Sequence, residues 1–366
     1  MTMKPTLSIA GGGTGGHVMP ALALADAARE AWPELSVQFI GAERGLEATL
    51  LPERGEDVLL LSMHSVQGAG LAQKIRVLLW ELPKAVLQVR SHWKSKPPHL
   101  VVGVGGYASV TGVLAALVSR IPVILYEQNA VPGMVNRKLV RFCKKIMLGF
   151  AEAARLLPAE KSVMTGNIVR ADISATSHSA HTPPRLLVLG GSQGALFLND
   201  HIPAACQLLK ERGHSFEVTH VAGNQKADAV IDSYQKAGVD AEVLEFCSDM
   251  PSLYNSGDMM IARSGAMTVG EVAICGMPTI FVPLPHAADN HQYYNARAMA
   301  ESGGAIIVEQ KLGSVEHLAD EIETILFDAN RLKEMSSAAK SWATADAKAM
   351  QLKTISRYLP LSEVNA

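Results

Sequence analysis

The chain has 366 residues, 48% of them hydrophobic and 19% charged, which favours two folded domains with sizeable cores and excludes an intrinsically disordered chain. Its four cysteines are scattered without a C-x-x-C pair, which argues against a zinc site or a disulfide framework and fits a reducing cytosol. The net charge of −2 is unevenly distributed: residues 1–165 carry 18 basic and 12 acidic side chains, whereas residues 166–366 carry 15 basic and 23 acidic side chains. A basic first half favours binding of phosphorylated ligands, anionic lipid head groups or nucleic acid.

The first predicted strand, Leu7–Ala10, runs into a glycine-rich loop. Gly11, Gly13 and Gly16 have the G-x-G-x-x-G spacing, and His17 follows at the start of a predicted helix. A glycine turn between a strand and a helix exposes backbone N–H groups beside the positive end of the helix dipole, so it can hold a phosphate without a cationic side chain. A neutral imidazole at the mouth of such a loop is a candidate general base; the alternative is that His17 only caps the loop or hydrogen-bonds to it.

The same glycine spacing occurs in dinucleotide-binding folds, which also need an Asp or Glu about 20 residues later, at the end of the second strand. The second predicted strand here, Val37–Gly41, is followed by Glu43 inside a loop. The fit is poor, so a nicotinamide-dependent oxidoreductase is the weaker interpretation of this loop.

The segment His64–His99 is basic and amphipathic. It carries six Lys and Arg against Glu81 alone, and ten large apolar residues lie between Ile75 and Trp93. Such a surface is expected where a protein contacts a membrane without crossing it. The alternative is an ordinary domain helix with a solvated basic face. Val135–Met147 has the same character.

A second apolar segment, Pro97–Ser119, has no charged residue and is long enough to span a bilayer. It opens with two prolines and is interrupted by the glycines of 103–106. We therefore predict a buried strand over Leu100–Val104, a second glycine turn and a buried helix over Val110–Arg120.

Strand and helix patterns alternate along the remaining sequence, which predicts an α/β fold. A third strand-to-glycine turn, Gly190–Gly194, opens the second half as Gly11–Gly16 opens the first. We expect two similar, doubly wound, Rossmann-like domains that face each other across a cleft. Further predicted strands cover 122–127, 185–191, 216–223, 258–264 and 278–284, and further predicted helices cover 20–31 and 199–212.

Polar residues follow the predicted strands of the second half, where ligands collect in open α/β sheets. A strand ends at Ala262 and leads through a small-residue turn into a helix, with Thr268 and Glu271 in its first part. Glu271 in the first turn either stabilises the helix dipole or accepts two hydrogen bonds from a ribose diol. Arg170, near the domain boundary, can reach a diphosphate. Further candidates for binding sugar hydroxyls are His286, Asp289, Gln292 and Asn295.

Seven motifs stand in one order along the chain: "GGGTGGHVMPALALA", "GVGGYAS", "YEQNAVPG", "GNIVR", "GGSQGA", "ARSGAMTVGE" and "FVPLPHAADNHQYYNA". Together they resemble the MurG-type transferases, over about residues 5–350. The resemblance implies a GT-B fold and an inverting transfer of N-acetylglucosamine from UDP-GlcNAc to the C4 hydroxyl of N-acetylmuramic acid in lipid I. The product, lipid II, is the precursor for peptidoglycan synthesis and thus for cell-wall biogenesis, cell shape and division.

The resemblance also implies which substrate each domain binds. Residues 1–165 with a C-terminal helix, 342–366, would form the acceptor and membrane-facing domain, and residues 166–341 the donor domain. The first glycine loop would hold the acceptor diphosphate, with His17 as the general base and Glu127 as the second choice. The family's donor contacts fall on Thr14, Gly15, Gly16, Asn129, Arg170, Ser192, Cys247, Ala266, Met267, Thr268, Val269, Gly270, Glu271 and Gln292.

Four residues depart from the family's pattern. Ile168 stands in place of a common proline, which would leave the approach to Arg170 less rigid, and Tyr126 replaces the usual histidine before Glu127. Cys247 replaces an aliphatic residue and would act through its backbone on uracil. Gly270 replaces a common serine and would loosen the helix start beside Glu271.

The resemblance implies a peripheral protein at the cytoplasmic face of the bacterial inner membrane. Its partners would be UDP-GlcNAc, lipid I, the anionic membrane surface and cell-wall synthesis proteins, without nucleic acid. We expect no cofactor and no essential metal, because no D-x-D motif is present. The alternatives are a GT-B enzyme with a different lipid or natural-product acceptor, and a non-catalytic nucleotide-sugar binding protein.

Overall fold

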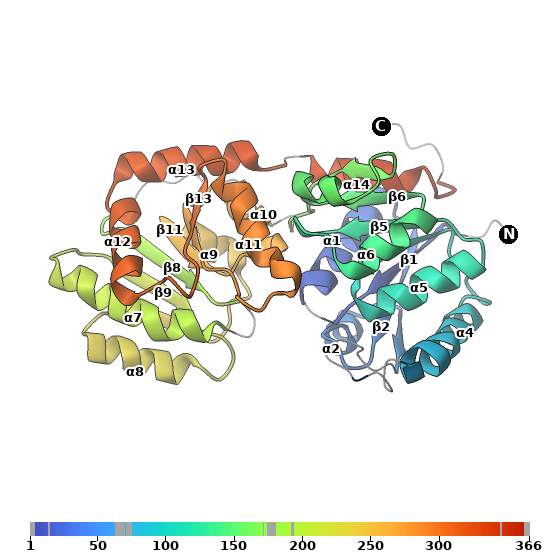
Figure 1. Cartoon of the computed structure of the whole chain (residues 1–366), viewed down its shortest axis with the longest axis horizontal. Helices are drawn as coiled ribbons and strands as arrows, with labels where there is room; N and C mark the ends of the chain where they lie inside the picture. Colours follow the sequence, from blue (N-terminus) through green and yellow to red (C-terminus); the bar gives the residue numbers. More distant parts are fainter. Residues whose placement is uncertain are drawn as a thin grey trace. The chain divides into compact units, whose positions relative to one another are not determined.

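The computed structural model describes residues 4–13, 15–62, 70, 75–170, 172–173, 181–191, 194–344 and 346–361. The chain forms two compact units, drawn in Figure 1. The first unit comprises residues 1–169 and 346–366, and the second comprises residues 170–345. Each is described by itself below.

The first unit is a seven-stranded parallel sheet in the order β3-β2-β1-β4-β5-β6-β7. The chain builds outward from β1 to β3 and then restarts at β4 on the other side, so the topological switch point lies between β1 and β4. Its strands are β1 (Thr6–Gly11), β2 (Ser36–Ala42), β3 (Val58–Leu61), β4 (Leu100–Gly105), β5 (Val123–Glu127), β6 (Lys145–Leu148) and β7 (Ser162–Met164). Its helices are α1 (Gly15–Ala31), α2 (Glu47–Glu53), η1 (Val77–Glu81), α4 (Leu82–His92), α5 (Gly106–Val118), α6 (Met134–Leu139), η2 (Val140–Phe142), η3 (Ala151–Leu156) and α14 (Ala347–Ser356).

Alternate strand residues supply two cores, one on each face of this sheet. Leu7 and Ile9 face a core completed by α1 and by Ile355 of α14, whereas Ala10 and Val101 face the core beneath α4 and α5. This period-two alternation is what a sheet covered on both faces requires. The last helix thus belongs to the core of the first unit.

The second unit is a six-stranded parallel sheet in the order β10-β9-β8-β11-β12-β13, with its switch point between β8 and β11. Its strands are β8 (Arg185–Leu189), β9 (Glu217–Val221), β10 (Ala241–Leu244), β11 (Met259–Ala262), β12 (Thr279–Phe281) and β13 (Ala305–Ile307). Its helices are α7 (Leu196–Glu211), α8 (Ala227–Ala237), α9 (Met250–Asn255), α10 (Ala266–Cys275), η4 (Ala288–Asn290), α11 (His291–Ala300), α12 (Val315–Leu326) and α13 (Ala329–Trp342).

The prediction of an α/β fold with two doubly wound sheets is confirmed, and every predicted strand is present. The predicted helix starts were too late: α1 begins at Gly15 and α5 begins at Gly106. In both cases the glycine loop runs directly into the helix, so the helix begins with glycine. Within the described residues, no helix has the length and apolar character needed to cross a bilayer.

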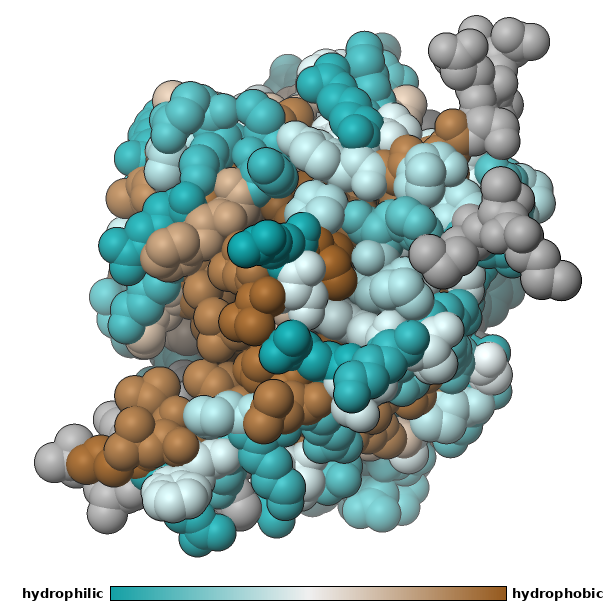
Figure 2. Space-filling model, turned by 90° about the vertical axis from the view of Figure 1, so that its right-hand side faces the viewer, coloured by the Kyte–Doolittle hydropathy of each residue, from teal (hydrophilic) through white to brown (hydrophobic). Residues whose placement is uncertain are grey.

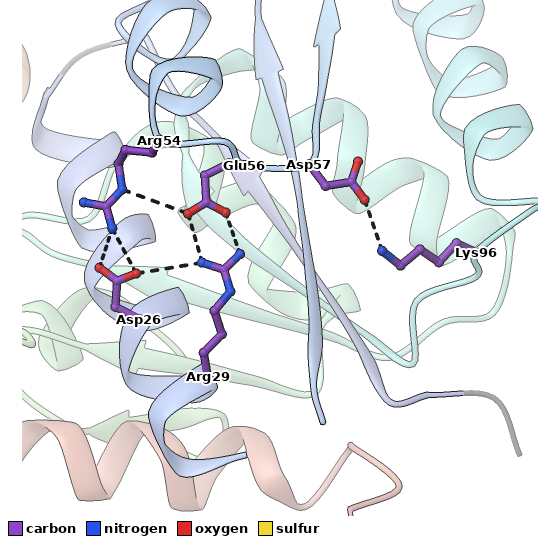
Figure 3. Close-up of polar contacts among 6 residues, drawn as sticks. All are labelled: Asp26, Arg29, Arg54, Glu56, Asp57 and Lys96. Carbon is purple, nitrogen blue, oxygen red and sulfur yellow. Dashed lines mark hydrogen bonds and ion pairs between the residues drawn. The ribbon is translucent and has the colours of Figure 1, made fainter. Parts of the chain in front are cut away.

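Four charged side chains connect the far ends of α1 and α2 in the first unit (Figure 3). Arg29 donates two hydrogen bonds to the carboxylate of Glu56, which is 5% exposed. The hydrogen bonds from Arg29 to Glu56 raise the pKa of the arginine, against the opposing effect of burial. Arg54 donates to Asp26 at 2.9 Å. Because Glu56 is bidentate and nearly buried, this network holds the two helices more firmly than isolated surface pairs would.

A buried histidine makes the stability of the second unit pH-dependent. His220 is 0% exposed, its ring nitrogens contact Asn199 Oδ1 and Tyr234 Oη, and burial lowers its pKa from 6.5 to about 4. On acidification the unfolded chain takes up this proton first, so stability is lost as the pH falls from about 6.5 towards 4. We expect His220 to account for a loss of about 2 kcal/mol between pH 8 and pH 5. Denaturant unfolding of the wild type and of His220→Gln at both pH values measures it, and equal losses in the two proteins would contradict it.

Candidate functional site

Two glycine loops meet at the switch point of the first unit. β1 leads into α1 through Gly12 and Gly13, and β4 leads into α5 through Gly105 and Gly106. Gly106 has φ +78°, and a Cβ there would lie 2.3 Å from the Gly12 carbonyl oxygen. Only glycine allows both that backbone conformation and that approach. Two of the three predicted glycine turns are therefore parts of one site.

His17 lies over the second of these loops. It is the third residue of α1 and is half-buried. A Cβ on Gly105 would lie 2.7 Å from His17 Nε2, so the imidazole packs on the backbone that begins α5. Of the predicted loop contacts, Gly15 and Gly16 form the first residues of α1, and Thr14 lies outside the described residues. The imidazole thus stands at a helix N-terminus beside two backbone turns.

A buried carboxylate beneath the first loop was missed by the sequence reasoning, which considered only Glu43 in this region. Glu47 begins α2 and is 0% exposed. Its Oε2 accepts a hydrogen bond from the Gly13 N–H at 2.8 Å, and its Oε1 accepts one from the Ala42 N–H at 2.9 Å. No local sequence pattern marks this role, because the Gly13 N–H lies 34 residues away along the chain.

Glu127 is a structural residue, which corrects its ranking as a second candidate base. Its carboxylate is 2% exposed and accepts hydrogen bonds from the backbone and side chain of Asn129, from Gly133 N–H and from the Asn136 amide. Burial raises its pKa, while these hydrogen bonds act in the opposite direction. A carboxylate enclosed by four donors has no free face for a substrate proton. It shapes the loop after β5 and fixes Asn129, a predicted contact, at the carboxyl edge of the sheet.

Tyr126 and Ile168, two departures from the family pattern, are both built into the first unit. The Tyr126 hydroxyl donates to Asn167 Oδ1 at 2.9 Å, and burial raises its pKa. Ile168 is 4% exposed and packs in the same core as Tyr126. The Gln351 amide of α14 donates to the Gly166 carbonyl at 2.7 Å. The segment that precedes Arg170 is therefore held by both core packing and hydrogen bonds.

In the second unit, Glu271 is the sixth residue of α10, whose N-cap is Gly265. It therefore lies in the second turn, so the expectation of a first-turn position was wrong and the helix dipole does not explain its presence. Its Oε2 accepts a hydrogen bond from the Tyr254 hydroxyl at 2.8 Å. Burial raises its pKa, and the Tyr254 hydrogen bond and the charge of Arg170 partly offset that rise.

Arg170 is the cation of this cluster. Its Nε lies 3.4 Å from Asp172 Oδ1, and its charge acts on Glu271 and Tyr254. The buried nitrogens Nε and Nη2 have no hydrogen-bond partner within the described residues. A guanidinium whose buried N–H groups make no hydrogen bond within those residues is suited to a planar or tetrahedral oxyanion.

The glycine turn after β8 lies at the switch point of the second unit. Gly191 and Gly194 have φ +81° and +70°, and a Cβ on Gly194 would lie 2.0 Å from the Ala222 carbonyl oxygen at the end of β9. Ser192, a predicted contact, lies outside the described residues. Across the switch point, β11 leads into α10.

The loop after β12 is tied to the start of α10. Gln292 Oε1 accepts from the Leu284 N–H, and its backbone carbonyl accepts from the Ser264 hydroxyl. Asn295 is 0% exposed and donates to the Ser264 carbonyl, so its prediction as a sugar-binding residue was wrong. His286 and Asp289 are exposed.

The remaining predicted contacts differ in how much of each side chain is accessible. Val269 is 0% exposed and Ala266 is 7% exposed, so both can meet a ligand only through the backbone. Met267, Thr268 and Gly270 are half-buried. Cys247, also half-buried, donates to the Asp249 carbonyl. In the second unit the structure therefore brings together Arg170, Glu271 and Tyr254, and it links Gln292 to the turn before α10.

Comparisons with known proteins cover both units. Residues 7–148 match the glycosyltransferase family 28 N-terminal domain, and residues 185–351 match the glycosyltransferase family 28 C-terminal domain. A UDP-N-acetylglucosamine--N-acetylmuramyl-(pentapeptide) pyrophosphoryl-undecaprenol N-acetylglucosamine transferase from Anaeromyxobacter sp. (strain K) is 41% identical over 336 residues, 91% of this chain and 88% of the relative. A protein of the same name from Aeromonas hydrophila is 38% identical and covers 94% of each chain.

Solved structures are similar to this chain along almost its whole length. Acinetobacter baumannii MurG is 31% identical, with a TM-score of 0.80 over 96% of this chain and 99% of that one. The calicheamicin glycosyltransferase CalG4 is 15% identical with a TM-score of 0.67 over 98% of both chains, which shows a shared fold alone. These neighbours have the GT-B fold, and so does this chain.

Proposed function

Because the chain belongs to the MurG family of UDP-GlcNAc-dependent N-acetylglucosaminyltransferases, we propose that it transfers N-acetylglucosamine from UDP-GlcNAc to lipid I to form lipid II. The observation that carries this proposal is the match at 41% identity across 91% of the chain. The glycine turns at both switch points and the residues around them support it, since the reaction needs a site for each of two diphosphates.

In the proposed reaction, the C4 hydroxyl oxygen of N-acetylmuramic acid attacks C1 of the donor sugar as the bond from C1 to UDP breaks. The configuration at C1 inverts in this single displacement. His17 takes the proton of the attacking hydroxyl, and the first glycine loop holds the acceptor diphosphate. Arg170 and the glycine turn after β8 stabilise the negative charge that grows on UDP. Glu271 accepts two hydrogen bonds from the ribose diol.

The decisive assay is UDP release from UDP-GlcNAc with and without lipid I. Lipid I-dependent release, with lipid II as the product, supports the proposal. UDP-GlcNAc binding without release would identify a nucleotide-sugar binding protein instead. Release that requires a different acceptor would identify another GT-B transferase.

Replacing Glu271 with alanine is expected to raise the KM for UDP-GlcNAc roughly tenfold or more, because two hydrogen bonds to the ribose are lost. The kcat at saturating donor should change much less, since the ribose lies far from the reacting bond. Initial rates at varied donor concentration measure this, with the exposed Glu211→Ala on α7 as the control. An unchanged KM would refute the ribose contact.

We propose that the first unit docks on the cytoplasmic face of the membrane. Leu78 and Leu79 are each 62% exposed, Trp80 is 77% exposed and Leu87 is 61% exposed, whereas Val89 is in the core. Figure 2 looks onto the side of the first unit that carries α4 and α5 and shows hydrophobic side chains gathered there among hydrophilic ones. Large apolar side chains exposed together with lysines and arginines support contact with an anionic bilayer.

The double variant Leu79→Ala with Trp80→Ala is expected to weaken binding to anionic vesicles by about 2 kcal/mol or more, roughly thirtyfold. Both side chains are exposed, so stability should not change. Vesicle co-sedimentation measures the effect. Leu312→Ala, which removes a side chain that is 66% exposed in the second unit, is the matched control. Equal binding by all three proteins would exclude this surface.

A further inference from the structure

The Glu47 carboxylate occupies a pocket made for it under the first glycine loop. A Cβ on Gly12 would lie 2.0 Å from Glu47 Oε1, one on Gly45 would lie 2.1 Å from Oε2, and one on Gly41 would lie 2.5 Å from Cγ. Three glycines thus approach one side chain closely: one lies in the loop after β1, and two lie between the end of β2 and the start of α2. Any larger residue at these positions would displace the carboxylate.

Burying a carboxylate costs several kcal/mol unless it is hydrogen-bonded. Glu47 is 0% exposed and meets that cost with two N–H donors, Gly13 in the loop and Ala42 at the end of β2. Charged acceptors form shorter and stronger hydrogen bonds than neutral ones. The carboxylate therefore joins the glycine loop to the neighbouring strand more firmly than an amide or hydroxyl could.

The helix that carries Glu47 is anchored at its other end as well. Arg54, the C-cap of α2, pairs with Asp26 of α1, and Glu56 just beyond it binds Arg29 of α1 (Figure 3). α2 is therefore fixed to the C-terminal part of α1 by ion pairs and to the loop before α1 by Glu47. The short helix acts as a brace for the loop.

We infer that Glu47 is a positioning residue for the acceptor site: it holds the turn at Gly13 and thereby sets where Gly15, Gly16 and His17 lie. This inference rests on the proposed function, in which the loop binds the acceptor diphosphate. It also limits which backbone groups of the loop can bind phosphate, because the Gly13 N–H already donates a hydrogen bond to Glu47. The acceptor phosphates are left with amides beyond Gly13.

Charge and position predict opposite results for Glu47→Gln. The variant removes a negative charge beside an anion site, so an electrostatic effect alone would lower the KM for lipid I. A glutamine also offers only one acceptor oxygen and turns its NH2 towards one of the two backbone N–H groups, which releases the loop. If the glycine loop moves when Glu47 no longer holds it, the variant should have a higher KM for lipid I and a lower kcat.

The test compares Glu47→Gln and Gly45→Ala with the wild type. Gly45→Ala displaces the same carboxylate, since its Cβ would lie 2.1 Å from Oε2, and it leaves the sequence of the glycine loop unchanged. The control is Glu53→Gln, which removes an exposed carboxylate from the same helix. The measurements are kcat and KM for lipid I, the Kd of UDP by calorimetry, and hydrogen exchange of the Gly13 and Ala42 amides.

We expect both variants to lose about tenfold to a hundredfold in kcat/KM for lipid I, to bind UDP within twofold of the wild type, and to exchange the Gly13 amide faster. Glu53→Gln should match the wild type in all three measurements. A folded Glu47→Gln with unchanged kcat/KM, or with a lower KM for lipid I, would overturn the inference. Parallel losses in UDP affinity would also overturn it, because they indicate general damage.

Different results would contradict the role of Glu47 and the proposed function. A wild-type protein that releases no UDP with lipid I would end the proposed function, whereas amide exchange would still decide whether Glu47 holds the loop. Should Glu47→Gln not fold, Gly45→Ala carries the same test, because it retains the carboxylate and changes only its place.

Discussion

Replacing His17 with alanine is expected to lower kcat for lipid I by roughly a hundredfold to ten-thousandfold, the usual contribution of a general base. The imidazole stands at the N-terminus of α1 and packs on Gly105, where a Cβ would come within 2.7 Å of Nε2. A neutral imidazole at this position can accept the proton of the attacking hydroxyl. The Kd of UDP-GlcNAc should not change, since the proposed donor contacts of the second unit are untouched.

The measurement is single-turnover transfer at saturating substrates across pH 5–9, with His317→Ala on α12 as the control. In the wild type the rate should fall at acid pH as the base becomes protonated, and this decrease should be absent from the residual rate of His17→Ala. Near-normal turnover in the variant would exclude His17 as the base.

Replacing Arg170 with alanine is expected to lower kcat by roughly a hundredfold to a thousandfold, the scale found when one group that stabilises a developing oxyanion is removed. Its Nε and Nη2 are buried and make no hydrogen bond within the described residues, and Nε has only an ion pair at 3.4 Å with Asp172 there. The departing diphosphate can therefore bind without first breaking hydrogen bonds of these two nitrogens. Arg170→Lys should recover only part of the loss, because an ammonium keeps the charge but not the planar arrangement of donors.

A second prediction for Arg170→Ala concerns the pH dependence of donor binding. The charge of Arg170 lowers the pKa of Glu271 against the rise caused by burial, so that pKa should rise further in Arg170→Ala. Donor binding that needs the Glu271 carboxylate should then be lost at a higher pH than in the wild type. Calorimetric titration of UDP-GlcNAc from pH 4.5 to 8 tests the shift, with Arg331→Ala as the control. Identical profiles would show that the two residues do not act together.

Most of the strands that the sequence predicted have four or more consecutive apolar residues or run into glycine. The missed strands lack such runs or lie at the sides of the sheets. β7 and β13 have three residues each, and β10 contains a glutamate. β6 lies in the basic segment 135–147, whose pattern indicated a surface, yet Ile146 and Met147 are fully buried. Short strands of this kind are specified by their neighbours in the sheet, and a local pattern does not reveal them.

The glycine turns of the site could be predicted because strand, glycine and helix are adjacent in the sequence. Glu47 could not be assigned in the same way, since its two N–H partners lie 34 and 5 residues away and its pocket exists only when the loop after β1 meets the end of β2. Asn295 was misassigned for a related reason: from its position alone, a polar residue that binds a buried carbonyl resembles one that binds a ligand. Packing decides between these roles, and packing is non-local.

The order in which the chain is synthesised gives α14 a particular importance. The second unit is one continuous stretch, 170–345, whereas the first unit needs residues from both of its segments. Ile355 and Leu359 complete the core against α1. During synthesis on the ribosome, the whole sequence of the second unit is therefore available while the apolar face of α1 is still uncovered. The first unit, although its synthesis starts first, can complete its fold only after the second unit has been synthesised. A nascent chain halted before Ala347 should accordingly expose that face to chaperones, although it already contains every proposed catalytic residue.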